Sequence, residues 1–328
     1  MPAMVTLAVG MLALAHLQRA LDAAPTTPQV EEGYVTAPDG VRLFYQKVGD
    51  GRAKVIIPGR LFVYDDFKHL TRGRTLVFYD MRNRGRSDAV TDTTAMGIRS
   101  AVSDLEAVRR HFGFERVSLV GYSYLGFMVV LYAVDYPDRV ERIVQLGPVP
   151  RKFGTEYPKR LVESDPGVDS AAWQRLRQQR AAGLDTARPK EYCELEWSVL
   201  RSRLVGKPAN VNRLGPGPCD MKNEWPANLA RHFRYALASV QQLDVPADSL
   251  ARVTVPVLTI HGTRDRNAPY GAGREWAMTL PNARLLTVRG AAHQSWAEEP
   301  VIVLTAIDRF LADQWPAGAE RVSSLDAR

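Results

Sequence analysis

Short apolar runs alternate with amphipathic segments along most of this chain. Residues 33–48, GYVTAPDGVRLFYQKV, alternate apolar and polar positions around a PDG turn, which predicts a β-hairpin. The apolar runs AKVIIPG (53–59) and TLVFYD (75–80) end in glycine or aspartate, as buried parallel strands do where they enter functional loops. Residues 97–114, GIRSAVSDLEAVRRHFGF, have helical apolar spacing and close near Gly113, a predicted helix cap.

The same alternation continues toward the C-terminus. Further strands are predicted at RVSLV (116–120), RVERIVQLG (139–147), VTVPVLTIHG (253–262) and ARLLTVRG (283–290). Further helices are predicted at SYLGFMVVLYAVDYP (123–137), near YGAGREWAMTL (270–280) and within PVIVLTAIDRFLADQW (300–315). Alternating strands and helices indicate the α/β class, with a mostly parallel sheet covered on both faces.

The middle of the chain breaks this rhythm. Residues 151–235 are charged and helical in pattern, with no convincing strand, and are interrupted by GVDS, GLDTARPK and GPGPCD. The sequence therefore predicts an α/β core at 31–150 and 236–316 with a helical cap at 151–235. The tail, 317–328, has few apolar side chains to bury and is expected to fray.

Residues 1–30 carry an apolar run from Met4 to Leu14, followed by alanine-rich sequence with a cleavage site near Ala23. The run has signal-peptide length and is too short to span a bilayer securely, and no other segment suggests a transmembrane helix. No Lys or Arg precedes it. A cleaved signal, which favours a periplasmic or extracellular protein, and an ordinary N-terminal helix both fit.

Composition narrows the class of protein. The chain has 328 residues, of which 45% are hydrophobic and 24% charged, as in a globular protein with a sizeable core. The net charge is +7 and the pI about 9.5, but Lys and Arg are scattered and locally dense only in MRNRGR and RLRQQR. This distribution favours ordinary surface charge over a nucleic-acid partner.

Two cysteines, Cys193 and Cys219, lie in the predicted cap. Neither has a second cysteine or a histidine at metal-ligand spacing, so no zinc site is predicted. They form one disulfide if the protein is exported, or remain two separate thiols in a reducing compartment.

The stretch LVGYSYLGFMVVLYA (119–133) contains the strongest candidate for chemistry. A predicted strand meets Gly121, and Ser123 stands at the turn into a long apolar helix. Asp265 follows a later strand in a polar loop, and His293 follows another strand in a small-residue loop. A serine hydroxyl becomes a useful nucleophile when a histidine removes its proton and an acid orients that histidine.

These segments resemble the α/β-hydrolase fold family, in which the nucleophile stands on a sharp strand-turn-helix elbow. The resemblance implies a catalytic triad of Ser123, Asp265 and His293, which occur in the family's order. Gly121 matches the elbow motif, but Leu125 stands where a second small residue is expected, with Gly126 one place later.

A second motif of the family is YDMRNRGRSD, residues 79–88. Asp80, Arg82, Gly85 and Ser87 are in step with the family, while Asn83 stands where glycine is usual. Asparagine tolerates the left-handed backbone conformation, so this departure is mild.

The resemblance also implies two backbone donors for a developing oxyanion. Tyr124, directly after the nucleophile, is one, and Arg60 is the first choice for the other, with Leu61 the second choice. Pro58 stands where the family often has histidine. We name four candidates for substrate binding: Leu61, Glu194, Glu224 and Trp296.

The resulting hypothesis is a cofactor-free, metal-free serine hydrolase that acts on a small or medium carboxylic ester. A serine nucleophile argues against the dehalogenase and epoxide-hydrolase branches, which use a carboxylate. The alternatives are an aminopeptidase similar to prolyl aminopeptidases, whose HGGPG-type loop and tryptophan-bearing elbow are absent here, and a non-catalytic binding protein of the same fold. His261 is predicted to be packed or hydrogen-bonded, and His69, His111 and His232 to be structural. The sequence leaves the substrate and the oligomeric state open.

Overall fold

The predicted hairpin forms one edge of a mixed sheet. The computed structural model describes residues 29–163 and 170–325, and its strands form one sheet in the order β1-β2-β4-β3-β5-β6-β7-β8-β9. The strands from β4 to β8 in that order are parallel, and β1, β2 and β9 pair antiparallel. Their bounds are β1 Val30–Thr36, β2 Arg42–Val48, β3 Ala53–Pro58, β4 Arg74–Tyr79, β5 Val117–Tyr122, β6 Val140–Leu146, β7 Val257–Gly262, β8 Ala283–Val288 and β9 Ala319–Glu320.

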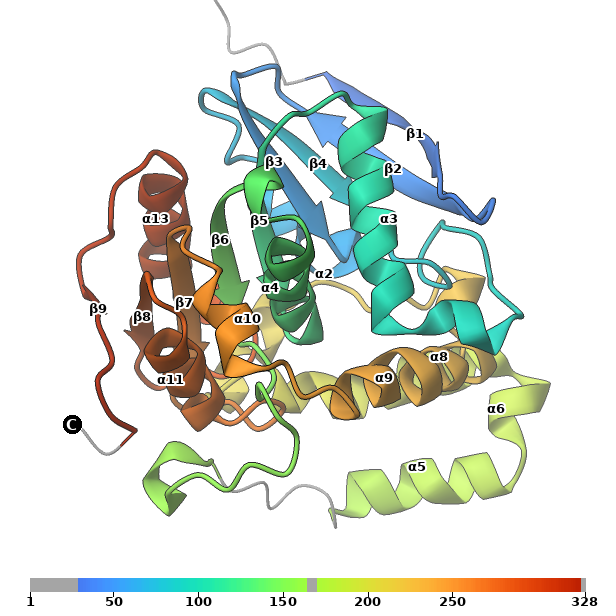
Figure 1. The fold of residues 1–328 in the computed structure, drawn as a ribbon. Coiled ribbons are helices and arrows are strands. Elements are labelled where there is room, and N and C mark those ends of the chain that lie inside the picture. The colour runs from blue at the N-terminus through green and yellow to red at the C-terminus, as the bar shows by residue number, and fades with distance from the viewer. Residues whose placement is uncertain (1–28, 164–169, 326–328) are drawn as a thin grey trace, which may run out of the picture.

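Helices cover both faces of the sheet (Figure 1). One face packs against α3 (Ile98–His111), α4 (Tyr124–Asp135) and α11 (Tyr270–Thr279), and the other against α2 (Arg60–Phe67) and α13 (Pro300–Leu311). Successive strand residues point to opposite faces of the sheet. On β5, Leu119 packs in the core on the side of α3, α4 and α11, and Val120 in the core on the side of α2 and α13. Burial on both faces explains why these strands read as continuous apolar runs.

The segment between β6 and β7, residues 147–256, is called the insertion. Its described residues contain helices and no strand, and Figure 1 shows α5 as its outermost helix. Its α-helices are α5 Ala171–Ala181, α6 Leu184–Ala187, α7 Pro189–Leu200, α8 Pro226–His232, α9 Ala238–Gln241 and α10 Ala247–Ala251. A π-helical turn, Phe233–Leu237, joins α8 to α9, so the helix runs past the expected boundary at residue 235.

A disulfide joins Cys193 and Cys219 inside the insertion, with their Cα atoms 5.7 Å apart. Cys193 lies on α7, and Cys219 follows the glycine- and proline-rich loop GPGP at 215–218. The sequence left open a disulfide or two separate thiols, and the structure has the disulfide.

The end of the chain differs from expectation. Residues 317–325 do not fray, because β9 pairs with Leu285 and Leu286 of β8 and because Val322 is buried. Arg274 also donates a hydrogen bond of 2.8 Å to the carbonyl oxygen of Ser324. The remaining tail, 326–328, and the predicted export signal within 1–28 lie outside the described residues.

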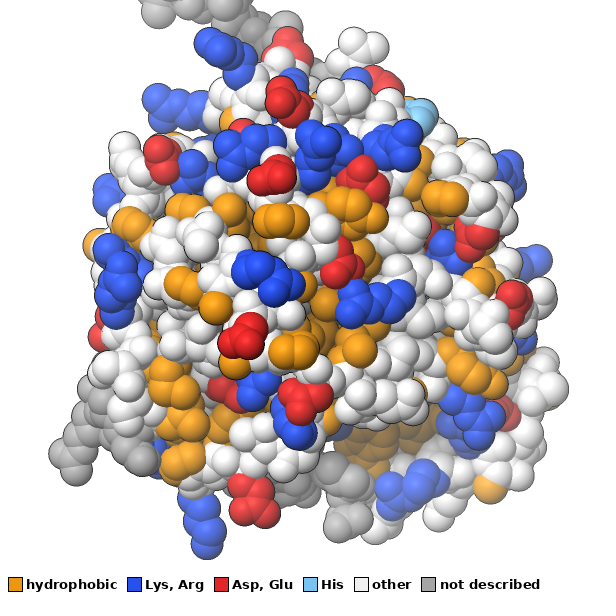
Figure 2. All heavy atoms as spheres, in the orientation of Figure 1, with side chains coloured by type: hydrophobic (Ala, Val, Ile, Leu, Met, Phe, Trp, Pro, Cys, Tyr) orange, Lys and Arg blue, Asp and Glu red, His pale blue; other side chains and the backbone are white. Residues whose placement is uncertain are grey.

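Surface charge on the face shown in Figure 2 is mixed. Lys and Arg side chains lie among Asp, Glu and apolar side chains rather than in one continuous patch. Within the described residues, no helix is both long enough and apolar enough to cross a membrane.

Candidate active site

Ser123 is the single residue between the end of β5 and the start of α4. Its backbone has φ 58° and ψ −126°, in the left-handed half of the map, which costs a non-glycine residue about 1–3 kcal/mol. The turn is held by a hydrogen bond of 2.8 Å from Ser123 N to Leu146 O and one of 2.9 Å from Gly126 N to Ser123 O. Ser123 is half-buried, whereas Tyr122 before it is buried. The strained turn therefore holds the serine at a partly open position.

Leu125 stands where the elbow motif has a small residue, and a glycine in a neighbouring loop makes space for its side chain. A Cβ on Gly121 would lie 2.3 Å from the carbonyl oxygen of Leu125, so only glycine fits there. The Leu125 side chain extends toward the loop after β3, where a Cβ on Gly59 would lie 2.5 Å from Leu125 Cδ1. Glycine at position 59 thus makes room for the larger residue at 125.

His293 and Asp265 form a buried pair. The Nδ1 atom of His293 lies 2.7 Å from Oδ2 of Asp265, whose exposed fraction is 1%. The other oxygen, Oδ1, accepts the backbone N–H groups of Asn267 at 2.8 Å and Ala268 at 2.9 Å. Burial alone would raise the pKa of Asp265, but the charge of His293 and the hydrogen bonds from His261 and His293 hold that pKa well below its usual range. An ionised carboxylate only accepts, so Nδ1 of His293 donates.

This pair lies beside the Ser123 turn. The ring of Tyr122, the residue before the serine, lies 4.7 Å from the ring of His293, centroid to centroid. A Cβ on Gly147, directly after β6, would come within 3.1 Å of both Asp265 Oδ2 and His293 Nδ1. The ends of β5, β6, β7 and β8 therefore bring the three predicted triad residues into one region, as parallel strands do at their carboxyl ends.

The loop after β3 presents the predicted oxyanion donors. Gly59 is left-handed, with φ 77° and ψ 42°, and α2 begins at Arg60. The N–H groups of Arg60 and Leu61 are in the first helical turn, where the helix itself supplies no acceptor. The donor from Tyr124 is likewise in the first turn of its helix, α4.

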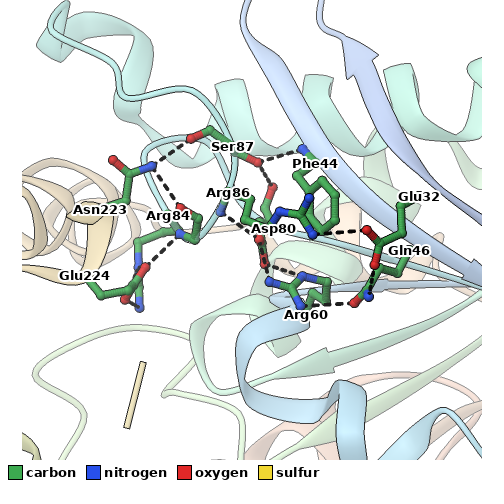
Figure 3. Close-up of polar contacts among 11 residues, drawn as sticks. Glu32, Phe44, Gln46, Arg60, Asp80, Arg84, Arg86, Ser87, Asn223 and Glu224 are labelled. Atoms are coloured by element: carbon green, nitrogen blue, oxygen red, sulfur yellow. Dashed lines mark hydrogen bonds and ion pairs between the residues drawn. The ribbon is translucent and has the colours of Figure 1, made fainter. Parts of the chain in front are cut away.

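The Arg60 side chain is fixed by a buried carboxylate (Figure 3). Its Nε and Nη2 donate to the two oxygens of Asp80 at 3.0 and 2.9 Å, and its Nη1 donates to Gln46 at 3.0 Å. The guanidinium also lies over the ring of Phe44, 5.1 Å from its centroid. Asp80 in addition accepts the backbone N–H of Arg86 at 2.9 Å, so it joins two loops of the core.

Glu224 is held in a second buried ion pair, between the insertion and the core (Figure 3). Arg84 donates to Glu224 through Nε at 2.9 Å and Nη2 at 2.7 Å, and Gly85 N donates at 2.8 Å. The exposed fractions are 4% for Arg84 and 1% for Glu224. The neighbouring Asn223 donates to the carbonyl oxygens of Gly85 and Ser87. Glu224 is thus a link between two parts of the fold, not the free carboxylate that substrate binding requires.

Tyr124 connects the Ser123 turn to the insertion. Its hydroxyl lies 2.9 Å from Nε2 of His232 on α8. Burial raises the pKa of Tyr124 to about 12. Burial also lowers the pKa of His232 well below its usual range, and the charge of Arg84 adds to this effect. The imidazole is therefore neutral, and its tautomer decides whether Nε2 or the Tyr124 hydroxyl donates in this hydrogen bond.

Two other predicted substrate-binding residues have different surroundings. The Glu194 side chain is 59% exposed, 3.9 Å from Lys190, in a shallow hollow that it shares with Trp225. Trp296 is buried in the core against Phe67 and Tyr122, and its indole N–H donates to Asp66 at 2.9 Å. Neither residue lines the cavity next to the loop after β3.

Leu61, the fourth of these candidates, does line that cavity. The cavity has a volume of about 260 Å³ and lies between α2 and the insertion segment 213–218. Arg60 and Gln294, the neighbour of His293, also contribute to its lining, as does Trp197. No group of three or more His, Cys, Asp or Glu side chains within the described ranges could hold a metal ion.

The chain is similar to known proteins along most of its length. The model of the alpha/beta hydrolase fold family matches residues 62–300. A bifunctional esterase/perhydrolase of Acinetobacter calcoaceticus is 28% identical over 276 residues, covering 80% of this chain and 92% of its own. A proline iminopeptidase of Lactobacillus delbrueckii subsp. bulgaricus is 26% identical over 243 residues, covering 69% of this chain and 76% of its own.

A solved esterase structure from Exiguobacterium antarcticum matches with a TM-score of 0.64 at 16% identity, covering 86% of this chain and 100% of its own. At this identity the match shows a shared fold.

Proposed function

The chain belongs to the α/β-hydrolase fold family and is a hydrolase, and we propose that it cleaves small or medium carboxylic esters through an acyl-enzyme on Ser123. One observation carries the proposal: the left-handed, half-buried Ser123 follows Tyr122, whose ring packs on the His293–Asp265 pair. A strained serine beside a histidine with an ionised partner is the arrangement that nucleophilic catalysis requires.

In the proposed first step, Nε2 of His293 removes the proton from Ser123 Oγ as Oγ bonds to the ester carbonyl carbon. The C–O bond to the leaving alcohol then breaks, and His293 returns the proton to that alcohol. Water next attacks the acyl-serine with the same histidine as base, which releases the acid and restores Ser123. Asp265 stays ionised throughout; it holds the proton on Nδ1 of His293 and stabilises the transient imidazolium.

The oxyanion formed in each step receives N–H groups from Tyr124 and Arg60. One such donor contributes about 3–4 kcal/mol to lowering the barrier in related chemistry, so its placement matters. The Arg60–Asp80 pair supports the Arg60 assignment, because the bidentate contact fixes the residue whose N–H donates.

An aminopeptidase is the main alternative, and a proline iminopeptidase is among the relatives. A free substrate amine needs an available carboxylate. The oxygens of Glu224 are occupied by Arg84 and Gly85, and Glu194 is mostly exposed and outside the cavity next to the oxyanion loop. These positions favour an ester over a peptide that begins with a free amine.

The test is a substrate panel with the purified protein. We expect turnover of short-chain nitrophenyl esters, slow or no cleavage of prolyl and alanyl naphthylamides, and labelling of Ser123 alone by a fluorophosphonate. Ser123→Ala and His293→Ala should each lower kcat about 10⁴-fold or more. Fast naphthylamide cleavage that is lost on acetylation of the amine would favour the aminopeptidase. No turnover and no labelling would favour a binding protein.

A further inference from the structure

Asp265 is in contact with a second histidine. His261 lies on β7 with an exposed fraction of 0%, and its Nε2 is 3.2 Å from Asp265 Oδ2. The same Nε2 is 3.0 Å from the carbonyl oxygen of Ala268. Both neighbours are acceptors, so Nε2 of His261 carries a proton and shares it between them.

The other ring nitrogen of His261 favours one tautomer of the ring. Nδ1 is buried and has no hydrogen-bond partner among the described residues. It faces α11 closely, since a Cβ on Gly273 would lie 2.3 Å from it. An N–H at this place would be buried and unpaired, at a cost of about 1–3 kcal/mol. The tautomer with its proton on Nε2 therefore pairs that N–H with both acceptors and leaves no buried N–H unpaired at Nδ1.

We infer that His261 is a positioning residue for the proposed triad, holding Asp265 in the orientation that receives His293. The inference rests on the proposed function. Oδ2 receives two N–H groups, from His293 at 2.7 Å and His261 at 3.2 Å, while Oδ1 receives two backbone N–H groups. A carboxylate held on both oxygens cannot rotate away from His293.

The second donor also spreads the carboxylate charge. Asp265 is faced by His261 from β7 and by His293 from the loop after β8. Tyr122 faces it from β5, and burial raises the pKa of that tyrosine well above its usual value. On its α11 side, His261 meets the ring of Tyr270 at 5.9 Å, centroid to centroid. Without the His261 donor, more of the Asp265 charge acts on His293, which favours the imidazolium and weakens the base at neutral pH.

Two substitutions separate positioning from packing. His261→Leu removes the donor, whereas His261→Gln keeps an N–H at a comparable reach. For His261→Leu we expect the acid limb of the kcat/KM profile to move up by about half a pH unit or more and kcat to fall about tenfold with KM little changed. His261→Gln should stay near the unsubstituted protein, and His69→Leu, at an exposed histidine, should change neither quantity. An unmoved acid limb in His261→Leu, or Gln and Leu variants that behave alike, would overturn the inference.

A measurement on the unsubstituted protein covers the case in which His261→Leu does not fold. In ¹⁵N-histidine NMR, the His261 ring should carry a proton on Nε2, and its signal is assigned by its loss in His261→Gln. A ring with a bare Nε2 would contradict the proposed contact with Asp265. This readout needs no turnover, so failure of the esterase proposal in the substrate panel remains distinguishable from failure of this one.

Discussion

The side chain of Leu125 fills the space that a Cβ on Gly59 would need, with only 2.5 Å between that Cβ and Leu125 Cδ1. The two residues lie next to the two helix N-termini whose N–H groups we propose as oxyanion donors. Leu125 is in the first turn after Ser123, and Gly59 directly precedes Arg60. We therefore expect their packing to set the distance between the two proposed donors.

Gly59→Ala should lower kcat/KM about 100-fold or more, which is the effect of losing one oxyanion donor. The new methyl group would push α2 away from Leu125, and the left-handed φ of 77° adds backbone strain. Adding Leu125→Ala should recover part of the activity, because it removes the clash and leaves only the strain. Steady-state kinetics on a nitrophenyl ester measures both.

Gly40→Ala is the matched control for this pair. Gly40 also has a left-handed φ, of 88°, but nothing lies within 4 Å of a Cβ there. It should lose stability while keeping its kcat. A Gly59→Ala enzyme that Leu125→Ala does not improve would contradict the proposed spacing role.

The elements of the core could be predicted because each buries a long apolar face. β4 and β5 are largely apolar runs, and α3 has apolar residues at helical intervals. β9 could not be predicted, because two residues show no periodicity and its pairing depends on β8. α2 was missed for a related reason: its sequence RLFVYDDF buries only Val63 and Phe67, so no apolar stripe marks it.

The site could be predicted in part. Strand ends followed by Ser123, Asp265 and His293 are visible in the sequence, and the fold brings all three to one edge of the sheet. The ion pair of Glu224 with Arg84 could not be predicted, because Arg84 lies 140 residues earlier and no local sequence pattern indicates the contact. The hydroxyl of Tyr124 reaches His232 over 108 residues in the same way.

Glu224→Gln should lower the free energy of unfolding by about 3 kcal/mol, because it leaves the Arg84 charge buried without its partner. Urea denaturation measures the loss. Glu194→Gln, at an exposed side chain, should leave the urea midpoint nearly unchanged. If Glu224 instead held a substrate amine, Glu224→Gln would raise KM for free-amine substrates selectively while stability stayed the same, and our assignment would be wrong.

Reduction of the Cys193–Cys219 disulfide should destabilise the insertion. The bond closes a loop with a sequence separation of 26, which the chain-entropy account values at about 3 kcal/mol. Thermal unfolding with and without reductant should show a lower Tm for the reduced protein, and the Cys193→Ser/Cys219→Ser variant should match it. Intact mass after alkylation of the unreduced protein should show no modified cysteine; two modified cysteines would rule the bond out.

Acid should destabilise the protein in part through His232. Burial and the nearby Arg84 charge hold its pKa in the folded state well below the ordinary value of 6.5. Below pH 6.5 the unfolded chain therefore binds a proton that the folded chain does not, and stability falls as the pH falls, by up to about 1.4 kcal/mol per pH unit. The stability that comes from keeping His232 neutral is fully present above pH 6.5. It is lost as the pH falls from 6.5 to the pKa of His232 in the folded state.

The effect of His232 on stability can be measured separately between pH 7 and pH 5. Asp265, whose folded pKa is also lowered from an ordinary value of 3.8, adds its own loss mainly below this window. Urea midpoints at pH 7, 6 and 5 should fall less steeply for His232→Gln than for the unsubstituted protein, because glutamine does not titrate but still offers Tyr124 a hydrogen-bond partner. His69→Gln, at an exposed histidine, should keep the original slope. Equal slopes for all three proteins would mean that His232 is protonated in the folded state, and the Tyr124 hydroxyl would then be the acceptor of that hydrogen bond.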